Sequence, residues 1–269
     1  MKKFFMAATL MLTMLFTGCG GDTADKPAEG DKTSEVKKIV VGLDDEYKPM
    51  GFKDENNQIV GFDVDLAKEA AKHLNAEVEF KAIDWSSKEA ELKSGRIDVI
   101  WNGLDITPER KENMLFSDPY MDNRQIIFVR KGDDLGIKEE ADLAGKAVGT
   151  QSGGTAENYF DSNKELKDSF RELKTYGDYV AAFMDLENGR LDCVVCDEIV
   201  GRDALKSKDA LEALDITVGP VTEFGIAFAK ENTELRDKVQ KAFDEIIADG
   251  SASKISEKWF GKDLLKKKN

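Results

Sequence analysis

From residue 36 onward, short apolar runs alternate with segments of helical periodicity, and this alternation constrains the fold more than any other feature of the sequence. Runs such as 39–43 and 97–101 are short, apolar and bounded by charged residues, as buried parallel strands are. Between them, apolar residues recur at helical spacing over 64–74, behind Asp63, which we expect to cap that helix. The alternation predicts an α/β protein with parallel sheets.

The same pattern continues to the C-terminus. Further strands are expected at 77–81, 125–130, 146–150, 191–196 and 224–230. Helices are expected from Ser86 or Ser87 to Gly95, over 180–188 with Gly189 as the stop, behind the cap Asn232, and from Ser251 to the end of Trp259-Phe260-Gly261.

The N-terminus carries an export signal. Lys2 and Lys3 precede an apolar run over 4–16, which is shorter than the roughly 20 helical residues that span a bilayer but has the length of a signal-peptide core. The run ends in Thr17-Gly18-Cys19, which resembles the processing box of bacterial lipoproteins, although Phe16 stands where Leu is usual.

We therefore expect a signal peptide over 1–18 and lipidation of Cys19. Residues 19–35 are small, polar and charged, and they are typical of a flexible tether. The protein would then be exported and anchored by lipid to the outer face of a bacterial cell membrane. Plain secretion with an incidental cysteine is the alternative.

Charge and composition exclude several classes of function. With 39 Lys plus Arg against 53 Asp plus Glu, the net charge is −14, which argues against binding nucleic acid by phosphate neutralisation. One His and three Cys make a zinc site or a His-dependent triad difficult to assemble, and we expect no metal and no cofactor.

Cys193 and Cys196 lie on a predicted strand, where residues three apart face opposite sides, so we interpret them as buried apolar residues. His73 lies in a polar stretch of a predicted helix and is expected to be solvated.

Five motifs in one order, between about Lys38 and Gly261, are similar to the successive signatures of the extracellular solute-binding proteins that deliver polar amino acids to ABC importers. The motifs are Gly61-Phe62-Asp63-Val64-Asp65-Leu66-Ala67, Ile106-Thr107-Pro108-Glu109-Arg110, Phe116-Ser117-Asp118-Pro119-Tyr120, Leu143-Ala144-Gly145-Lys146 and Lys258-Trp259-Phe260-Gly261. Their order over more than half of the chain is more specific than any one of them.

The resemblance implies a periplasmic-binding-protein-like fold of type II, in which two α/β lobes are joined by two crossing hinge strands and hold the ligand between them. On this chain the first lobe would be 36–121 plus 223–262 and the second 122–222, with hinge strands near 123–125 and 222–224. Residues 263–269 would form a basic C-terminal tail. The implied partners are a small-molecule amino acid and a membrane complex of ABC permease and ATPase, and the protein is expected to be a monomer.

An α-amino acid presents a carboxylate and an ammonium at a fixed separation, so a dry site needs a cationic donor, free backbone N–H groups and a carboxylate acceptor. Arg110 follows a predicted strand end and is the candidate clamp for the carboxylate, since its guanidinium donates two parallel hydrogen bonds. The turn 152–155, with Gly154 and Thr155, would offer N–H groups to the same carboxylate. By resemblance, Asp197 accepts the ammonium, assisted by the backbone of two further residues, Asn102 and Gly103.

The resemblance also implies a side-chain pocket formed by Asp44, Tyr47, Trp85 and Gln151. Phe52 is a further aromatic candidate, although it is shifted from the position directly after Pro that relatives use. Asp105 stands where relatives carry Ser or Thr. Because its carboxylate would repel that of the ligand, we expect Asp105 to contribute its N–H only and to turn its oxygens toward Arg110 or solvent.

These residues predict a polar L-amino acid as the ligand, with glutamine or a basic amino acid ahead of the rest, because an apolar ligand would leave buried polar groups unpaired. The protein is expected not to be an enzyme. Two alternatives stay open: an exported dehydratase of the same fold that acts on prephenate-like acids, which would need a general acid in the cleft, and a sensory receptor subunit that acts through a membrane partner.

Overall fold

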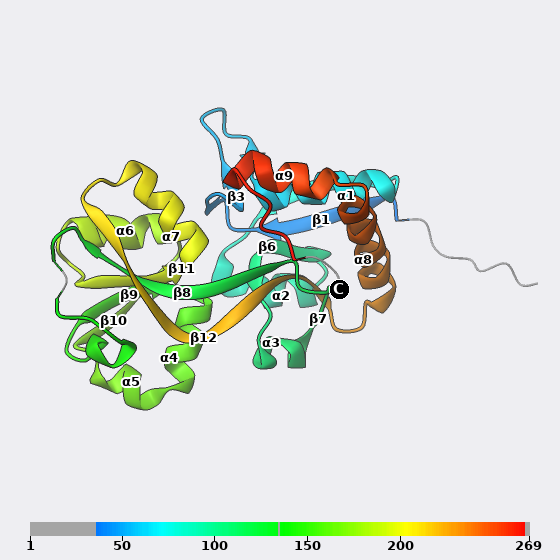
Figure 1. Ribbon diagram of the computed structural model, residues 1–269. Coiled ribbons are helices and arrows are strands. Elements are labelled where there is room, and N and C mark those ends of the chain that lie inside the picture. The colour runs from blue at the N-terminus through cyan, green and yellow to red at the C-terminus, as the bar shows by residue number, and fades with distance from the viewer. Residues whose placement is uncertain (1–35, 134, 267–269) are drawn as a thin grey trace, which may run out of the picture. The chain divides into compact units, whose positions relative to one another are not determined.

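The computed structural model describes residues 36–133 and 135–266 (Figure 1). The signal peptide, Cys19 and the tether lie outside the described residues, as do the last three residues of the expected tail. Within the described part, no helix combines the length and the apolar character needed to cross a membrane.

One large mixed sheet organises the chain, with the strand order β10-β9-β11-β8-β12-β6-β1-β5 and with β7 paired to β12. Its strands are β1 (Lys38–Leu43), β5 (Glu77–Ala82), β6 (Val99–Asp105), β7 (Met114–Phe116), β8 (Met121–Arg130), β9 (Ala147–Gln151), β10 (Glu172–Tyr176), β11 (Cys193–Asp197) and β12 (Leu211–Ala229). A small antiparallel sheet contains β2 (Glu46–Tyr47), β3 (Gly51–Lys53) and β4 (Ile59–Val60).

Helices connect and cover these strands. They are α1 (Phe62–His73), α2 (Lys88–Lys93), α3 (Pro108–Asn113), α4 (Thr155–Ser162), α5 (Lys164–Ser169), α6 (Tyr179–Glu187), α7 (Glu198–Ala204), α8 (Thr233–Ala248) and α9 (Ser251–Phe260). Short 3-10 turns occur at η1 (Trp85–Ser87), η2 (Glu140–Leu143) and η3 (Leu205–Ser207). The order of strands and helices confirms the predicted α/β class.

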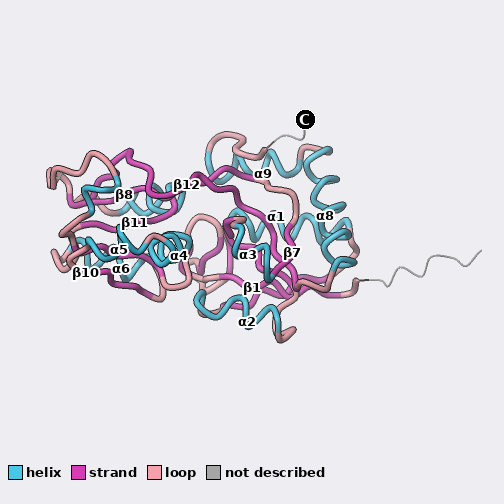
Figure 2. Tube along the Cα trace, turned by 90° about the horizontal axis from the view of Figure 1, so that it is seen from below, coloured by secondary structure: helices cyan, strands magenta, loops and turns pink. Residues whose placement is uncertain are grey.

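Two long strands run between two groups of elements. We call the group of β1–β7 with α1–α3, α8 and α9 the first lobe, and the group of β9–β11 with α4–α7 the second lobe; β8 and β12 join them (Figures 1 and 2). The two joining strands pair antiparallel at Thr222 with Asn123 and at Phe224 with Met121. This pairing supports the expected position of the hinge, while the residue bounds proposed for the two lobes stay a prediction.

Both lobes contain the expected parallel strands, and the two joining strands add antiparallel pairs to the sheet. Strands β1, β5 and β6 pair parallel in the first lobe, and β9, β10 and β11 pair parallel in the second, but β8 and β12 pair antiparallel with their neighbours. A strand that begins in one lobe and returns from the other must run against its partner, so the hinge imposes the antiparallel pairs. Strand β12 is also longer than the expected segment 224–230, since it begins at Leu211.

The two faces of the sheet bury separate apolar clusters. Cys193 belongs to a cluster of the second lobe with Val148 and Phe160, whereas Cys196 belongs to the larger cluster with Phe128 and Phe183. Both cysteines are buried free thiols. Their opposite faces agree with the interpretation of this C-x-x-C as part of a strand.

The predicted cap of the first long helix was wrong. Helix α1 has Gly61 at its N-cap, and the Asp63 carboxylate accepts from the Gly103 N–H at 2.7 Å and from the Tyr120 hydroxyl at 3.0 Å. Burial raises the pKa of Asp63 to about 7. The carboxylate therefore connects α1 to the end of β6 instead of closing its own helix.

Other helix starts fall near the expected residues. Ser87 is the N-cap residue of α2, as expected, although its side chain forms no capping hydrogen bond. The turn before α2 is capped by Asp84, whose carboxylate accepts from the Ser86 N–H at 2.9 Å. Asn232 caps α8 as predicted. His73 ends α1 and is exposed, as expected, and its Nδ1 lies 3.0 Å from Glu245 Oε2 of α8.

Residues 263–266, expected as the start of a tail, pack against the first lobe. Leu265 is buried in the large apolar cluster, and the Lys266 ammonium contacts Asp122 and Glu223, one on each joining strand, at 2.6 Å. The C-terminal segment therefore reaches the hinge.

Candidate functional site

The candidate residues gather where the parallel strands of the two lobes end. Asp44 follows β1, Asp105 ends β6, Gln151 ends β9 and Asp197 ends β11. The carboxyl ends of strands are where open α/β sheets bind ligands. The lobes contact one another here, since Gln151 Nε2 donates to Asp44 Oδ2 at 2.6 Å.

Arg110 is buried between the lobes. Its Nη1 donates to the Asp105 carbonyl at 3.0 Å and to the Thr155 hydroxyl at 3.2 Å, and its Nη2 donates to the Gly153 carbonyl at 3.2 Å. Among the described residues, its buried Nε has no acceptor. Nε and Nη2 form one edge of the guanidinium, which is the edge that a carboxylate can bind with two oxygens.

The expectation for the Asp105 side chain was wrong. Its carboxylate points neither to solvent nor to Arg110; it accepts from the Thr155 and Thr222 hydroxyls, each at 2.6 Å, and from Asn123 Nδ2 at 3.0 Å. Three neutral donors from three elements hold it at the hinge, while its backbone carbonyl contacts Arg110. The carboxylate is thereby kept away from the guanidinium edge.

Asp105 and Asp197 share donors on β8. Asn123 Nδ2 also donates to Asp197 Oδ1 at 2.6 Å, and Gln125 Nε2 donates to the same oxygen at 2.7 Å. Burial, and then the charge of Asp197, raises the pKa of Asp105 to about 6. Hydrogen bonds thus run without interruption from Arg110 through Thr155, Asp105 and Asn123 to Asp197.

The turn before α4 offers fewer free N–H groups than expected. The Ser152 N–H donates to the Tyr176 carbonyl, the Gly153 N–H to Glu157, and the Gly154 N–H to the Gln151 carbonyl. Protein acceptors thus occupy these three donors, which leaves the Thr155 N–H as the turn's candidate donor to a ligand.

Asp44 lies in acidic surroundings. Its carboxylate accepts from the Glu46 N–H at 2.9 Å as well as from Gln151. Burial raises the pKa of Asp44 to about 6, and the nearby charges of Asp178 and Asp45 act in the same direction. A positively charged group in this region would relieve the repulsion.

Aromatic rings line the same region. The Tyr47 and Trp85 rings are stacked with centroids 6.3 Å apart, and the Tyr179 ring lies 6.2 Å from Tyr47. All three side chains are buried, and burial raises the pKa of Tyr47 and of Tyr179 well above the usual value. The three rings together form an apolar surface, which we call the aromatic wall, and the tyrosine hydroxyls and the indole N–H are its polar groups.

Phe52 does not join this cluster. Its ring contacts Trp259 with centroids 5.9 Å apart, and the Lys48 ammonium lies 5.3 Å from its centroid. The shift of the phenylalanine from the position after Pro49 therefore places its ring against α9 instead of the wall.

Asn102 and Gly103 lie at the end of β6, as expected. The Asn102 side-chain oxygen accepts from the Asp44 N–H at 3.0 Å. Gly103 has φ +53, and a Cβ there would lie 2.9 Å from the Tyr47 ring. Glycine therefore lets the strand approach the aromatic wall. The Gly103 N–H donates to Asp63, and its carbonyl is the backbone group that could accept from an ammonium.

Sequence reasoning missed five residues of the site: Lys88, Asn123, Gln125, Tyr179 and Thr222. For Asn123 and Gln125 a signal existed, because polar residues two apart on a strand point to the same face. Tyr179 gave no such signal, since it reads as the first apolar residue of a helix; its hydroxyl is buried and has no partner among the described residues.

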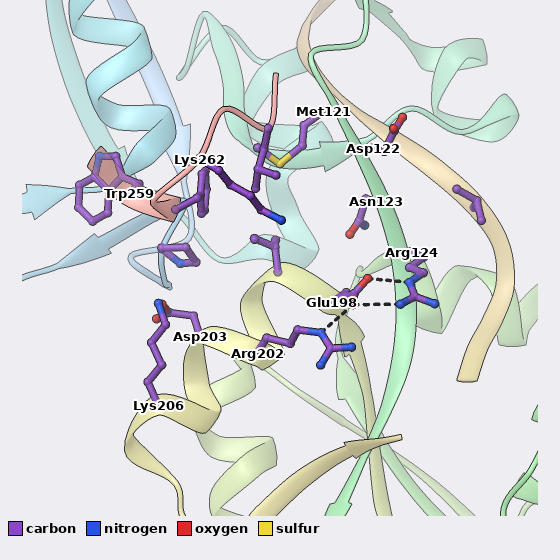
Figure 3. A pocket seen from close by; sticks show the side chains of 15 residues that line it. Met121, Asp122, Asn123, Arg124, Glu198, Arg202, Asp203, Lys206, Trp259 and Lys262 are labelled. Carbon is purple, nitrogen blue, oxygen red and sulfur yellow. Dashed lines mark hydrogen bonds and ion pairs between the residues drawn. The ribbon is translucent and has the colours of Figure 1, made fainter. Parts of the chain in front are cut away.

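A separate pocket of about 680 Å³ lies against the joining strand β8, and none of the twelve candidate residues for the ligand is among the described residues that line it (Figure 3). In Figure 3, Arg124 and Arg202 both contact Glu198, the residue after Asp197. Trp259 from α9 lines it from the first lobe. The Arg124–Glu198 ion pair therefore holds the start of α7 against β8, whereas the Arg202–Glu198 pair lies within α7.

The chain belongs to the bacterial extracellular solute-binding proteins, family 3, whose model matches residues 39–262. Among known proteins, it is similar to the L-cystine-binding protein TcyJ of Escherichia coli strain K12, with 34% identity over 88% of this chain and 87% of that protein. It is also similar to the ABC transporter arginine-binding protein 1 of the same strain, with 37% identity over 84% of this chain and 92% of that protein.

A solved structure supports the same assignment. The substrate-binding protein of an ABC uptake transporter from Streptococcus pneumoniae, with bound histidine, matches with TM-score 0.82 and 34% identity over 89% of this chain and all of that chain. These matches confirm the two-lobed fold and the class, which is an extracellular solute-binding protein and not an enzyme.

Proposed function

We propose that this protein is the receptor of an ABC importer that binds a polar L-amino acid, glutamine or a basic amino acid, between its two lobes and delivers it to the permease. The main support for the proposal is the buried Arg110. Its Nε and Nη2 form one edge of the guanidinium between the lobes, and Nε has no acceptor among the described residues. An α-carboxylate is the group that fits this edge.

The other contacts follow from that orientation. The Thr155 N–H would donate to the same carboxylate. Asp197 would accept a hydrogen bond from the ammonium, while Asn123 and Gln125 donate to Oδ1 of the Asp197 carboxylate. The ligand's side chain would lie along Tyr47 and Trp85 toward Asp44. An amide could donate to Asp44, and a cation could pair with it, whereas an acidic side chain would meet like charge.

The relatives support a polar amino acid as the ligand class. Their names and titles state cystine, arginine and histidine, each of which has an α-carboxylate and an α-ammonium. A thermal-shift panel of the twenty L-amino acids with the whole chain, purified in mild detergent, tests the class. Stabilisation by polar amino acids supports the proposal, and the absence of any stabilisation contradicts it.

Binding should bring the lobes together, because the ligand contacts Arg110 from one side and Asp197 from the other. Small-angle scattering should show a smaller radius of gyration with saturating ligand. An unchanged radius on confirmed binding would contradict a site shared by both lobes.

We further propose that the protein acts as a monomer, attached to the membrane through lipid on Cys19. Two or three acyl chains would be needed for stable attachment, because one holds only marginally. The Cys19→Ala variant should accumulate as precursor or leave the membrane fraction. Unchanged fractionation and an unchanged N-terminal mass would contradict the anchor.

A further inference from the structure

Lys88 is a buried cation that the proposed ligand contacts do not use. It lies on α2 of the first lobe, and the residue is 3% exposed. Its ammonium donates to the Trp85 carbonyl at 3.2 Å and to the Gly153 carbonyl at 2.7 Å, and it lies 5.1 Å from the centroid of the Trp85 ring. Within 36–133 and 135–266, no carboxylate forms an ion pair with it.

The Gly153 carbonyl belongs to the second lobe and accepts from two cations of the first. Arg110 Nη2 donates to it at 3.2 Å and Lys88 Nζ at 2.7 Å. The two nitrogens therefore lie within about 6 Å of each other, a separation at which like charges disfavour one another.

The second lobe contributes to the burial of Lys88. Gly153 has φ +71, and a Cβ on it would lie 2.8 Å from the Ser86 backbone and 3.2 Å from Lys88 Nζ. The second lobe thus covers the ammonium closely. When the lobes separate, Lys88 loses the Gly153 carbonyl and gains water.

The carboxylates near Lys88 do not compensate for the effect of burial on its charged form. Burial, and then the charge of Arg110, lowers the pKa of Lys88 to about 7, against the opposite effect of Glu89, Glu157 and Asp84. Glu157 is itself engaged, since it accepts from the Gly153 N–H at 2.6 Å. Lobe contact therefore carries an electrostatic cost that a further negative charge would offset.

We propose that Lys88 acts with Arg110 as a second cation that makes lobe closure depend on the ligand's α-carboxylate. The inference rests on the proposed function. Without an anionic group, closure brings two cations to one carbonyl and removes one of them from water. A carboxylate on the free Arg110 edge neutralises the pair, so Lys88 determines specificity for ligands with an ionised α-carboxylate.

Three variants separate the charge of Lys88 from its hydrogen bond. Lys88→Met removes both, Lys88→Gln keeps a donor for the Gly153 carbonyl without the charge, and Lys88→Arg keeps the charge. Lys93→Met, at an exposed position of the same helix, is the matched control. If Lys88→Met does not fold, Lys88→Gln carries the test.

Calorimetry on the whole chain in mild detergent would compare L-arginine and L-glutamine, each with its α-carboxamide. Wild type and Lys88→Arg should prefer the free acid strongly, and this preference should fall about tenfold in Lys88→Gln and Lys88→Met. An equal loss of affinity for acid and amide would overturn the proposal, since it would make Lys88 a contact between lobes only. An unchanged preference would overturn it as well.

Small-angle scattering without ligand tests the role of Lys88 separately from the proposed ligand class. By small-angle scattering without ligand, Lys88→Met and Lys88→Gln should have a smaller radius of gyration than wild type, because closure no longer buries a cation. A radius equal to that of wild type would overturn the role of Lys88, even if the amino acids bind as proposed. A smaller radius without any amino-acid binding would support Lys88 and count against the ligand class.

Discussion

Asp105 and Asp197, which end strands in different lobes, are joined by one side chain: Asn123 Nδ2 lies 3.0 Å from Asp105 Oδ1 and 2.6 Å from Asp197 Oδ1. Asn123 is on β8, one of the two joining strands. The hinge therefore does more than connect the lobes, because it also holds the carboxylate proposed to accept the ligand's ammonium.

Removing this shared donor should destabilise the protein. In Asn123→Ala, two buried carboxylates lose a hydrogen bond, and we expect the free energy of unfolding to fall by about 1–3 kcal/mol at pH 7.5. The loss should shrink below pH 6, because Asp105, with a pKa of about 6, is then protonated. Denaturant unfolding at pH 7.5 and pH 5 measures both, with the exposed Asn188→Ala as the control. A loss independent of pH would contradict the shared-donor account.

Replacing Arg110 should abolish most of the ligand affinity. A charge that loses its buried partner costs about 2–5 kcal/mol, so Arg110→Ala should bind at least tenfold more weakly, at about 1.4 kcal/mol per decade. Arg110→Lys should also bind weakly, since an ammonium cannot donate two parallel hydrogen bonds. Arg96→Ala, which removes an exposed ion pair with Glu91, is the control. Calorimetry that finds Arg110→Ala within threefold of wild type would refute the site.

Binding of a cationic ligand should weaken in acid. Asp44 has a pKa of about 6 without ligand. A cation binds its ionised form better and lowers this pKa, so affinity for L-arginine should be greatest above pH 6 and decrease as the pH falls from 6 to 4. Asp44→Asn should flatten this profile, and a slope that remains belongs to the other buried carboxyls with a raised pKa, Asp105 and Asp63. A wild-type affinity that is constant from pH 7 to pH 4 would show that Asp44 does not face the ligand's side chain.

Sequence patterns predicted the main features of the fold for a physical reason. Short apolar strands with helices between them can bury their faces in few ways. One of the ordered motifs contains Arg110, which lies on α3 shortly after β6, and Asp197 ends the strand expected at 191–196. The pairing of β12 was harder to predict, because residues 211–223 include Gly219 and Pro220 and lack a clear alternation. Its antiparallel register depends on contacts with β8 that are distant in sequence.

Side-chain orientation was the least predictable part of the site. Asp63 was expected to cap a helix and Asp105 to face Arg110 or solvent, but both accept hydrogen bonds from residues far away in the chain, Gly103 and Thr222. Lys88 likewise reads as an ordinary charge of an amphipathic helix. Its ammonium donates to the Gly153 carbonyl of the other lobe, and a local pattern carries no information on that contact.

We expect a polar L-amino acid, glutamine or a basic one, to bind between Arg110, Asp197 and Asp44. Competitive calorimetry on the whole chain, with wild type and Asp44→Asn side by side, measures this. Glutamine, lysine, arginine or histidine should bind more tightly than leucine, isoleucine or glutamate, and Asp44→Asn should lose more affinity for a cationic ligand than for glutamine. Tighter binding of leucine, isoleucine or glutamate than of all four would contradict it.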